Sequence, residues 1–139
     1  MDILQCVKDI SEILRIPTPK ISYNTSNFKT STMLAQIDVK NKIIYIKQGK
    51  SDLDLVFAIA HELRHMWQYK YFKSKYLKNY KNANEELTLE EYNLQPAEVD
   101  ANAFACAIIN CFFGVEPLWN GMTDKVVNAI RNKAKKIKI

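Results

Sequence analysis

Apolar residues recur at helical spacing in several parts of the chain. Over residues 2–15 they fall three or four positions apart with charged residues between them, and Pro17 and Pro19 then end the pattern. Residues 53–72 contain no glycine or proline, follow the candidate cap Ser51, and place their apolar side chains on one stripe. The pattern therefore predicts a first helix near the start of the chain and a second over 53–72.

Two further helices are predicted in the second half of the chain. Proline suits a first helical turn, and residues 96–113 are almost uninterrupted by polar residues until Gly114, so we expect this helix to be the most buried. Thr123 can cap a last helix through about residue 136. Residues 74–94 carry no sustained stripe and predict a partly helical surface connection.

Between the first and second helices the apolar period changes to two. Three apolar runs, at 21–23, 32–39 and 42–46, are separated by polar residues, and residues 38–42 form a candidate turn between the last two. The pattern predicts a small, mainly antiparallel sheet. Three glycines and four prolines are too few for the frequent turns of an all-β fold, so the chain as a whole predicts an α+β fold.

The composition indicates one globular domain in a reducing compartment. A chain of 139 residues with 47% hydrophobic residues can bury one core, so we expect a single domain over residues 1–139. No apolar run approaches the roughly 20 residues that span a bilayer, and the first segment is amphipathic, unlike a secretory signal. The three cysteines are odd in number, and Cys106 and Cys111 lie in an apolar segment, which favours reduced core thiols. We expect a cytoplasmic protein that does not enter the membrane.

The second helix carries a metal-binding motif. His61, Glu62 and His65 form H-E-x-x-H, and these are the only histidines of the chain. Two imidazoles four residues apart leave a helix on one face, here opposite its apolar stripe, and can bind one Zn²⁺ ion. The carboxylate of Glu62 then stands beside the open coordination position, where it can act as the general base that takes a proton from water. Two histidines and a carboxylate also suit Mn²⁺ and Fe²⁺.

A catalytic zinc site needs a third protein ligand, which here must be a carboxylate because no third histidine exists. The acidic residues available after the motif are Glu85, Glu86, Glu90, Glu91, Glu98 and Asp100. Helical geometry places Glu98 on a core-facing stripe with Asn102, whereas Asp100 points about 200° away. A buried carboxylate needs a cation, which favours Glu98 as the ligand. The alternative is that Glu98 only stabilises the first turn of its helix through the helix dipole.

Other polar residues are candidates for supporting roles. Asn102, one turn after Glu98, can accept a hydrogen bond from an imidazole N–H and so fix its tautomer, or it can satisfy a backbone group. A hydrolytic mechanism also needs a group that stabilises the oxyanion, for which Tyr92, Tyr69 and Arg64 are candidates. The residue pattern does not select one of these three.

The strings AHELRH at 60–65 and PAEVDANAFA at 96–105 resemble gluzincin metallopeptidases of the ImmA/IrrE-like group, which accompany phage and mobile-element repressors. The resemblance covers roughly residues 32–113. It implies a minimal zincin-like domain in which an E-x-E-A-N-x-F-A helix supplies the third zinc ligand, here Glu98. It also implies a zinc-dependent endopeptidase that cleaves a helix-turn-helix repressor. In such folds an edge strand beside the cleft binds the substrate backbone, and residues 42–46 are our candidate for it.

The chain departs from this group at two places. Many relatives have glycine where this chain has Arg64, and the apolar Leu-Met-Pro ending of the acidic helix is replaced by residues 108–111. These departures leave the predicted ligand residues in place, but the substrate can differ from that of the ImmA/IrrE-like group.

Two other functions compete with a repressor protease. Residues 69–81 interleave basic and aromatic side chains, residues 131–138 are strongly basic, and the net charge is +5, so the chain can make weak contacts with nucleic acid. An SprT-like protease would combine such contacts with the zinc site. The second alternative is a metal-binding interaction module without catalysis, for which a base such as Glu62 beside the metal would bring little advantage.

Overall fold

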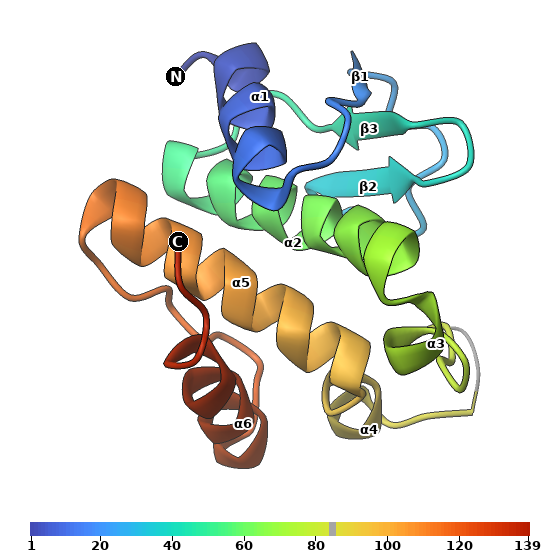
Figure 1. Cartoon of the computed structure of the whole chain (residues 1–139), viewed down its shortest axis with the longest axis vertical. Helices are drawn as coiled ribbons and strands as arrows, with labels where there is room; N and C mark the ends of the chain where they lie inside the picture. The colour runs from blue at the N-terminus through green and yellow to red at the C-terminus, as the bar shows by residue number, and fades with distance from the viewer. Residues whose placement is uncertain (84–85) are drawn as a thin grey trace.

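In the computed structural model, which describes residues 1–83 and 86–139, a small sheet lies on one side of a set of helices in an α+β fold (Figure 1). The helices are α1 (Ile3–Leu14), α2 (Asp52–Tyr71), α3 (Lys73–Tyr76), α4 (Leu89–Asn93), α5 (Pro96–Phe113) and α6 (Asp124–Ala134). The strands are β1 (Lys20–Ser22), β2 (Ala35–Asp38) and β3 (Ile43–Ile46). The four long helices confirm the expectation from the apolar pattern.

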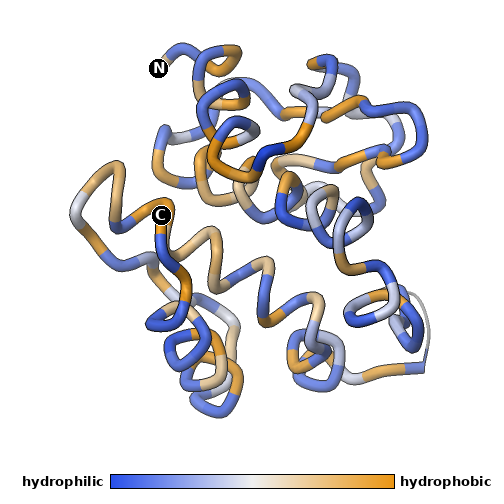
Figure 2. The backbone as a smooth tube through the Cα atoms, in the orientation of Figure 1, coloured by the Kyte–Doolittle hydropathy of each residue, from blue (hydrophilic) through white to orange (hydrophobic). Residues whose placement is uncertain are grey.

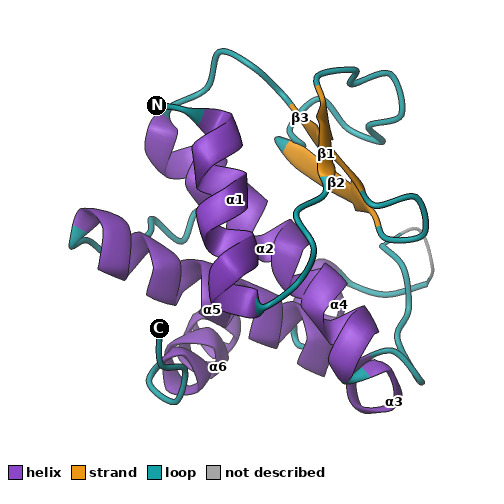
Figure 3. Ribbon diagram, turned by 45° about the horizontal axis from the view of Figure 1, so that its top comes forward, coloured by secondary structure: helices purple, strands orange, loops and turns teal. Residues whose placement is uncertain are grey.

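Helix α2 runs through the centre of the fold. Ser51 caps it, because its hydroxyl accepts a hydrogen bond from the Asp54 N–H, and the acidic side chains of the first turn suit the positive end of the helix. The sheet and α1 lie on one side of α2, and α5 lies along the other (Figures 1 and 3). The sheet and α5, which contribute residues to the candidate site, therefore both contact α2.

Helix α5 is the most buried helix, as the sequence predicts. Pro96 begins it, and Gly114 ends it in the left-handed conformation with φ 69°, which glycine adopts without strain. Apolar residues dominate along its length in Figure 2. The small side chains Ala97, Ala101 and Ala105 are fully buried, which lets α5 approach its neighbours closely. Even so, within the described part of the chain no helix has the length and apolarity to cross a membrane.

The sheet differs from the prediction in strand order and direction. Strands β2 and β3 form the expected antiparallel hairpin, but β1 pairs parallel to β3, so the order is β1-β3-β2 and the sheet is mixed. The edge strand proposed at 42–46 is therefore wrong, because β3 is central and β2 is the edge strand beside α2. Ile44 and Ile46 are fully buried, and such an apolar run gains most from the central position, where both of its edges are paired.

The cysteine prediction holds in part. All three cysteines are free, and Cys6 and Cys106 are buried as core thiols. Cys111 is exposed, contrary to the expectation, because the last turn of α5 extends beyond the core and exposes Phe112 and Phe113 as well. The apolar sequence of α5 therefore extends beyond the part of the helix that is buried.

The connection over residues 74–94 contains the short helices α3 and α4 in its described part. Thr88 and Glu91 form a capping box at the start of α4, in which each side chain accepts a hydrogen bond from the other's backbone N–H. This box stabilises the short helix α4. Helix α4 directly precedes α5, whose first turn contains Glu98.

Candidate metal centre

Three potential metal ligands converge between α2 and α5. His61 and His65 leave α2 on the side that faces the first turn of α5, where Glu98 lies. Their Nε2 atoms are 3.1 Å apart, and these atoms lie 3.3 Å from Oε1 and 3.1 Å from Oε2 of Glu98, respectively. The structure thus brings the three residues that the sequence nominated as ligands into one group of metal-binding size.

The spacing of this group fits a tetrahedral metal site. Ligand atoms at about 2.0–2.1 Å from a tetrahedral Zn²⁺ lie about 3.3–3.4 Å from one another, close to the three separations observed. Two imidazoles and one carboxylate leave a fourth position open, which is typical of catalytic zinc sites, whereas structural sites use four protein ligands. The same donors also suit Mn²⁺ and Fe²⁺.

Glu98 carries a charge that the two histidines stabilise in the interior. Its side chain is only 3% exposed. Burial raises the pKa of this carboxyl, but hydrogen bonds from His61 and His65 outweigh burial and hold the pKa well below its usual value. Burial likewise lowers the pKa of His65, whereas the hydrogen bond and charge of Glu98 raise it to a net value of about 9. A proton on His65 therefore balances Glu98 when no metal cation does.

Each imidazole has its Nδ1 atom next to a side-chain amide oxygen. His61 Nδ1 lies 2.7 Å from Oδ1 of Asn102, and His65 Nδ1 lies 2.9 Å from Oε1 of Gln68. Amide oxygens only accept, so both Nδ1 atoms carry hydrogen, and the neutral rings present Nε2 lone pairs to the metal site. Asn102 was predicted for this role from the sequence, but Gln68 was not, although it lies three residues after His65 on the same helix face.

Glu62 lies beside the three ligands without joining them. Its Oε1 accepts a hydrogen bond of 3.1 Å from the backbone N–H of Ile37 in β2, and its Oε2 lies 3.9 Å from Nε2 of His61. The carboxylate is thus held by the sheet on one side and faces the metal site on the other, as a general base requires.

Two tyrosines approach Glu98 from the connection before α5. The Tyr80 hydroxyl donates to Oε2 of Glu98 at 2.7 Å, so the Tyr92 hydroxyl, 2.9 Å away, donates to Tyr80. Burial and the charge of Glu98 raise the pKa of both phenols, that of Tyr92 to about 12, so both are neutral donors near pH 7. Tyr92 was predicted as an oxyanion donor and not for this contact, and Tyr80 was not predicted at all because it lies in a stretch without periodicity.

His61, His65 and Glu98 line a cleft with a volume of about 790 Å³. Its lining includes β2 and the residues before it, together with Leu77, Tyr80 and Leu89 from the connection before α5. Because the N–H of Ile37 points away from β3 towards Glu62, the outer edge of β2 faces the cleft. The backbone groups of Ala35, two residues earlier, point to the same side.

Arg64 does not face this cleft. Its guanidinium forms two hydrogen bonds with Asp100, of 2.8 and 3.0 Å, and lies 3.5 Å from the ring centroid of Trp67. Asp100 lies away from the metal site on α5, as helical geometry predicts, yet it is also buried, at 1% exposure. Tyr69, in contrast, lines the cleft and is 44% exposed.

The remaining acidic candidates are not part of the ligand group. Glu86 is exposed, Glu90 lies in the first turn of α4, and Glu91 belongs to the capping box. Glu85 lies outside the described residues.

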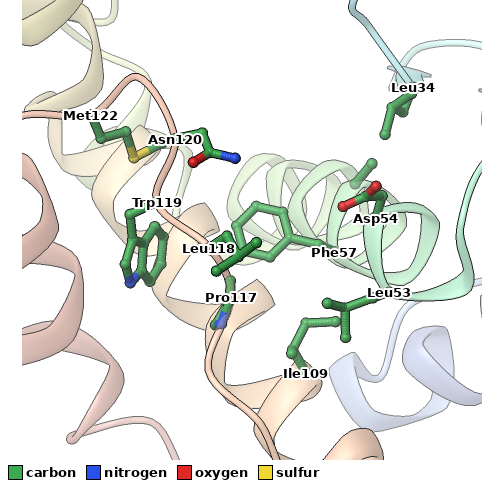
Figure 4. Close-up of a pocket in the computed structure, with 11 residues that line it drawn as sticks. Leu34, Leu53, Asp54, Phe57, Ile109, Pro117, Leu118, Trp119, Asn120 and Met122 are labelled. Atoms are coloured by element: carbon green, nitrogen blue, oxygen red, sulfur yellow. The ribbon is translucent and has the colours of Figure 1, made fainter.

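A smaller apolar pocket of about 330 Å³ adjoins the cleft (Figure 4). Leu34, Phe57 and Ala58 line both hollows, and Ala58 is one helical turn before His61. Figure 4 shows Trp119 and Met122, from the segment between α5 and α6, on the opposite wall of the pocket. An apolar side chain could therefore be buried close to the ligand group.

Comparison of the chain with known protein families, with curated proteins and with solved structures gives no match.

Proposed function

We propose that this protein is a zinc-dependent endopeptidase. The observation that supports this most directly is the convergence of two imidazole Nε2 atoms and the buried carboxylate of Glu98, with a second carboxylate, Glu62, held beside them at the edge of a cleft. A metal-binding module without catalysis explains the first three residues. It does not explain why a backbone N–H of the sheet orients Glu62.

Zn²⁺ bound to His61, His65 and Glu98 would supply Lewis acidity, which polarises a peptide carbonyl and makes water a better nucleophile near pH 7. Glu62 would accept a proton from the attacking water through Oε2, while its Oε1 keeps its hydrogen bond from the Ile37 N–H, and would pass that proton to the amine released when the peptide C–N bond breaks.

The substrate lies along the open edge of β2 in this proposal. An extended peptide can add to that edge through the backbone groups of Ala35 and so cross the cleft beside Glu62. One of its side chains can enter the apolar pocket next to Ala58. Of the three oxyanion candidates, Tyr69 lines the cleft and is the available donor, because the Tyr92 hydroxyl donates to Tyr80 and Asp100 engages Arg64.

The resemblance to ImmA/IrrE-like proteases adds the substrate class to this proposal. It points to a helix-turn-helix repressor as the protein substrate, and to action in the cytoplasm of a bacterial or phage-infected cell. A nucleic-acid-binding role is less well supported, because three lysines of 69–81, at positions 70, 73 and 75, lie over aromatic rings of the same segment. Lys73 lies over Tyr69, for example, and Tyr76 is buried.

Metal content and cleavage test the proposal together. Protein purified without a metal-binding tag should contain about one zinc per chain by elemental analysis, and His65→Ala and Glu98→Ala should lose it. Glu62→Gln should retain the zinc and lose cleavage of unfolded casein or a repressor by about 10²–10⁴-fold, because only the base is removed. A native protein that binds no zinc, even after zinc is added, contradicts the proposal.

A further inference from the structure

Gln68 is a polar side chain buried completely between α2 and α5. Its amide nitrogen donates two hydrogen bonds, one of 2.9 Å to the carbonyl of Ala97 and one of 2.8 Å to Oδ2 of Asp100. Its amide oxygen lies 2.9 Å from Nδ1 of His65. The proposed reaction assigns no role to this residue.

These contacts fix which way the amide of Gln68 points. A backbone carbonyl and a carboxylate are both acceptors, so the group that faces them must be the NH₂ end of the amide. A flipped amide would bring its oxygen against two other oxygens and its NH₂ against His65. Gln68 therefore presents an acceptor, and only an acceptor, to the imidazole.

Asp100 is itself held in place. Arg64 binds both of its carboxylate oxygens, and the guanidinium is packed over the ring of Trp67. Lys133 of α6 adds a second positively charged group, 3.9 Å from Oδ1 of Asp100. The acceptor that orients Gln68 is thus a buried, charge-paired group that has little freedom to move.

We propose that Gln68 is a positioning residue for the metal centre. Held by Asp100 and Ala97, it keeps the hydrogen of His65 on Nδ1 and directs the Nε2 lone pair towards His61 and Glu98. This inference rests on the proposed metal site and adds to it the chain Arg64–Asp100–Gln68–His65.

The two imidazoles differ in this respect. Asn102 faces Nδ1 of His61 through Oδ1, but among the described residues no hydrogen bond of its NH₂ group fixes the amide orientation. Gln68, in contrast, uses both ends of its amide. Removal of the Gln68 amide should therefore leave Nδ1 of His65 without a fixed acceptor, which packing by neighbouring side chains cannot supply.

Zinc affinity provides the first test. We would measure the zinc dissociation constant by competition with a chromophoric chelator for the native protein, Gln68→Met and Gln68→Asn. Methionine keeps the volume without the hydrogen bonds, and asparagine is too short to reach His65 from the same backbone position. Both variants should bind zinc about 10–100-fold more weakly. Gln48→Met, the same exchange at an exposed site, should leave the affinity unchanged.

Long-range ¹H–¹⁵N NMR of the zinc-loaded proteins provides the second test. The Nδ1 proton of His65 should be visible and protected from exchange in the native protein, and it should exchange rapidly in Gln68→Met while that of His61 does not change. A role of Gln68 in helix packing alone would lower stability and leave both readouts as they are. Unchanged affinity and an unchanged Nδ1 proton in a folded variant overturn the inference. Failure of the native protein to bind zinc overturns the metal site itself, and the inference with it.

Discussion

Tyr80 links a stretch of sequence without periodicity to Glu98, the candidate carboxylate ligand. Its hydroxyl donates to Oε2 of Glu98, the oxygen that also lies 3.1 Å from His65. Removing that bond in Tyr80→Phe should leave the carboxylate less well oriented and weaken zinc binding by about tenfold, with little loss of packing. Chelator competition measures the change, and Tyr23→Phe, at a tyrosine 46% exposed, is the matched control. Equal affinities in the two variants would show that the hydroxyl does not orient the ligand.

The negative charge of Asp100 should contribute strongly to the stability of the fold, because it pairs with Arg64 in the interior. Asp100→Asn leaves the guanidinium of Arg64, 11% exposed, without its counter-charge, and breaking a buried pair in this way costs about 3–5 kcal/mol. Urea unfolding in the presence of EDTA measures the loss without a contribution from bound metal. The exposed Arg131–Glu116 pair offers the contrast, since Glu116→Gln there should change the free energy of unfolding very little. Losses of similar size in both variants would contradict this assignment.

Helix α2 combines an ordinary capped start with an unusual polar face, and the two can be separated experimentally. Ser51→Ala removes the side-chain acceptor for the Asp54 N–H and should lower the free energy of unfolding by about 1 kcal/mol. Zinc affinity should not change, because the cap lies ten residues before His61. Thermal or urea unfolding and chelator competition check the two halves of this prediction, with Ser74→Ala, at an exposed serine, as the control. A parallel loss of zinc affinity would mean that the start of α2 moves the ligands.

The elements were predictable to the extent that their signals are local. Helices α1, α2, α5 and α6 follow from apolar spacing, caps such as Ser51, and stops such as Gly114. The sheet was predictable only as a hairpin, because strand order depends on what covers each face. The apolar run at 42–46 indicated a strand, but its burial at the sheet centre is set by α2 and α1, which the strand's own sequence does not show.

The candidate site divides in the same way. His61, Glu62 and His65 lie on one helix, and Glu98 could be nominated from the face of another, so four residues came from spacing and charge. Gln68 and Tyr80 were missed because their roles exist only once α2, α5 and the connection between them pack together. Arg64 was nominated for the cleft because its partner Asp100, 36 residues away, is not visible from helix geometry alone.

The molecule as a whole places a charged group between two of its longest helices. The sheet contributes Ile37 to hold Glu62, α5 contributes Glu98 and Asn102, and the connection contributes Tyr80. Because these contributions come from three separate parts of the fold, the ligand group forms only when the whole chain folds. Metal binding and folding should therefore be coupled, as they are wherever the unfolded chain has no preformed site.

The pH dependence of stability should reveal this coupling. In the metal-free protein the pKa of His65 is raised from its ordinary 6.5 to about 9, so the folded state holds a proton that the unfolded state releases first. That contribution is complete below pH 6.5 and is lost as the pH rises towards 9, so the metal-free protein should become less stable over this range. With one equivalent of zinc, Nε2 of His65 holds no proton, and the decline should disappear or reverse. Urea unfolding between pH 6.5 and 8.5, with EDTA and with zinc, compares the two slopes. His65→Ala should show neither the decline nor a response to zinc. If zinc does not change the pH dependence of the free energy of unfolding of the native protein, the metal does not bind at His65.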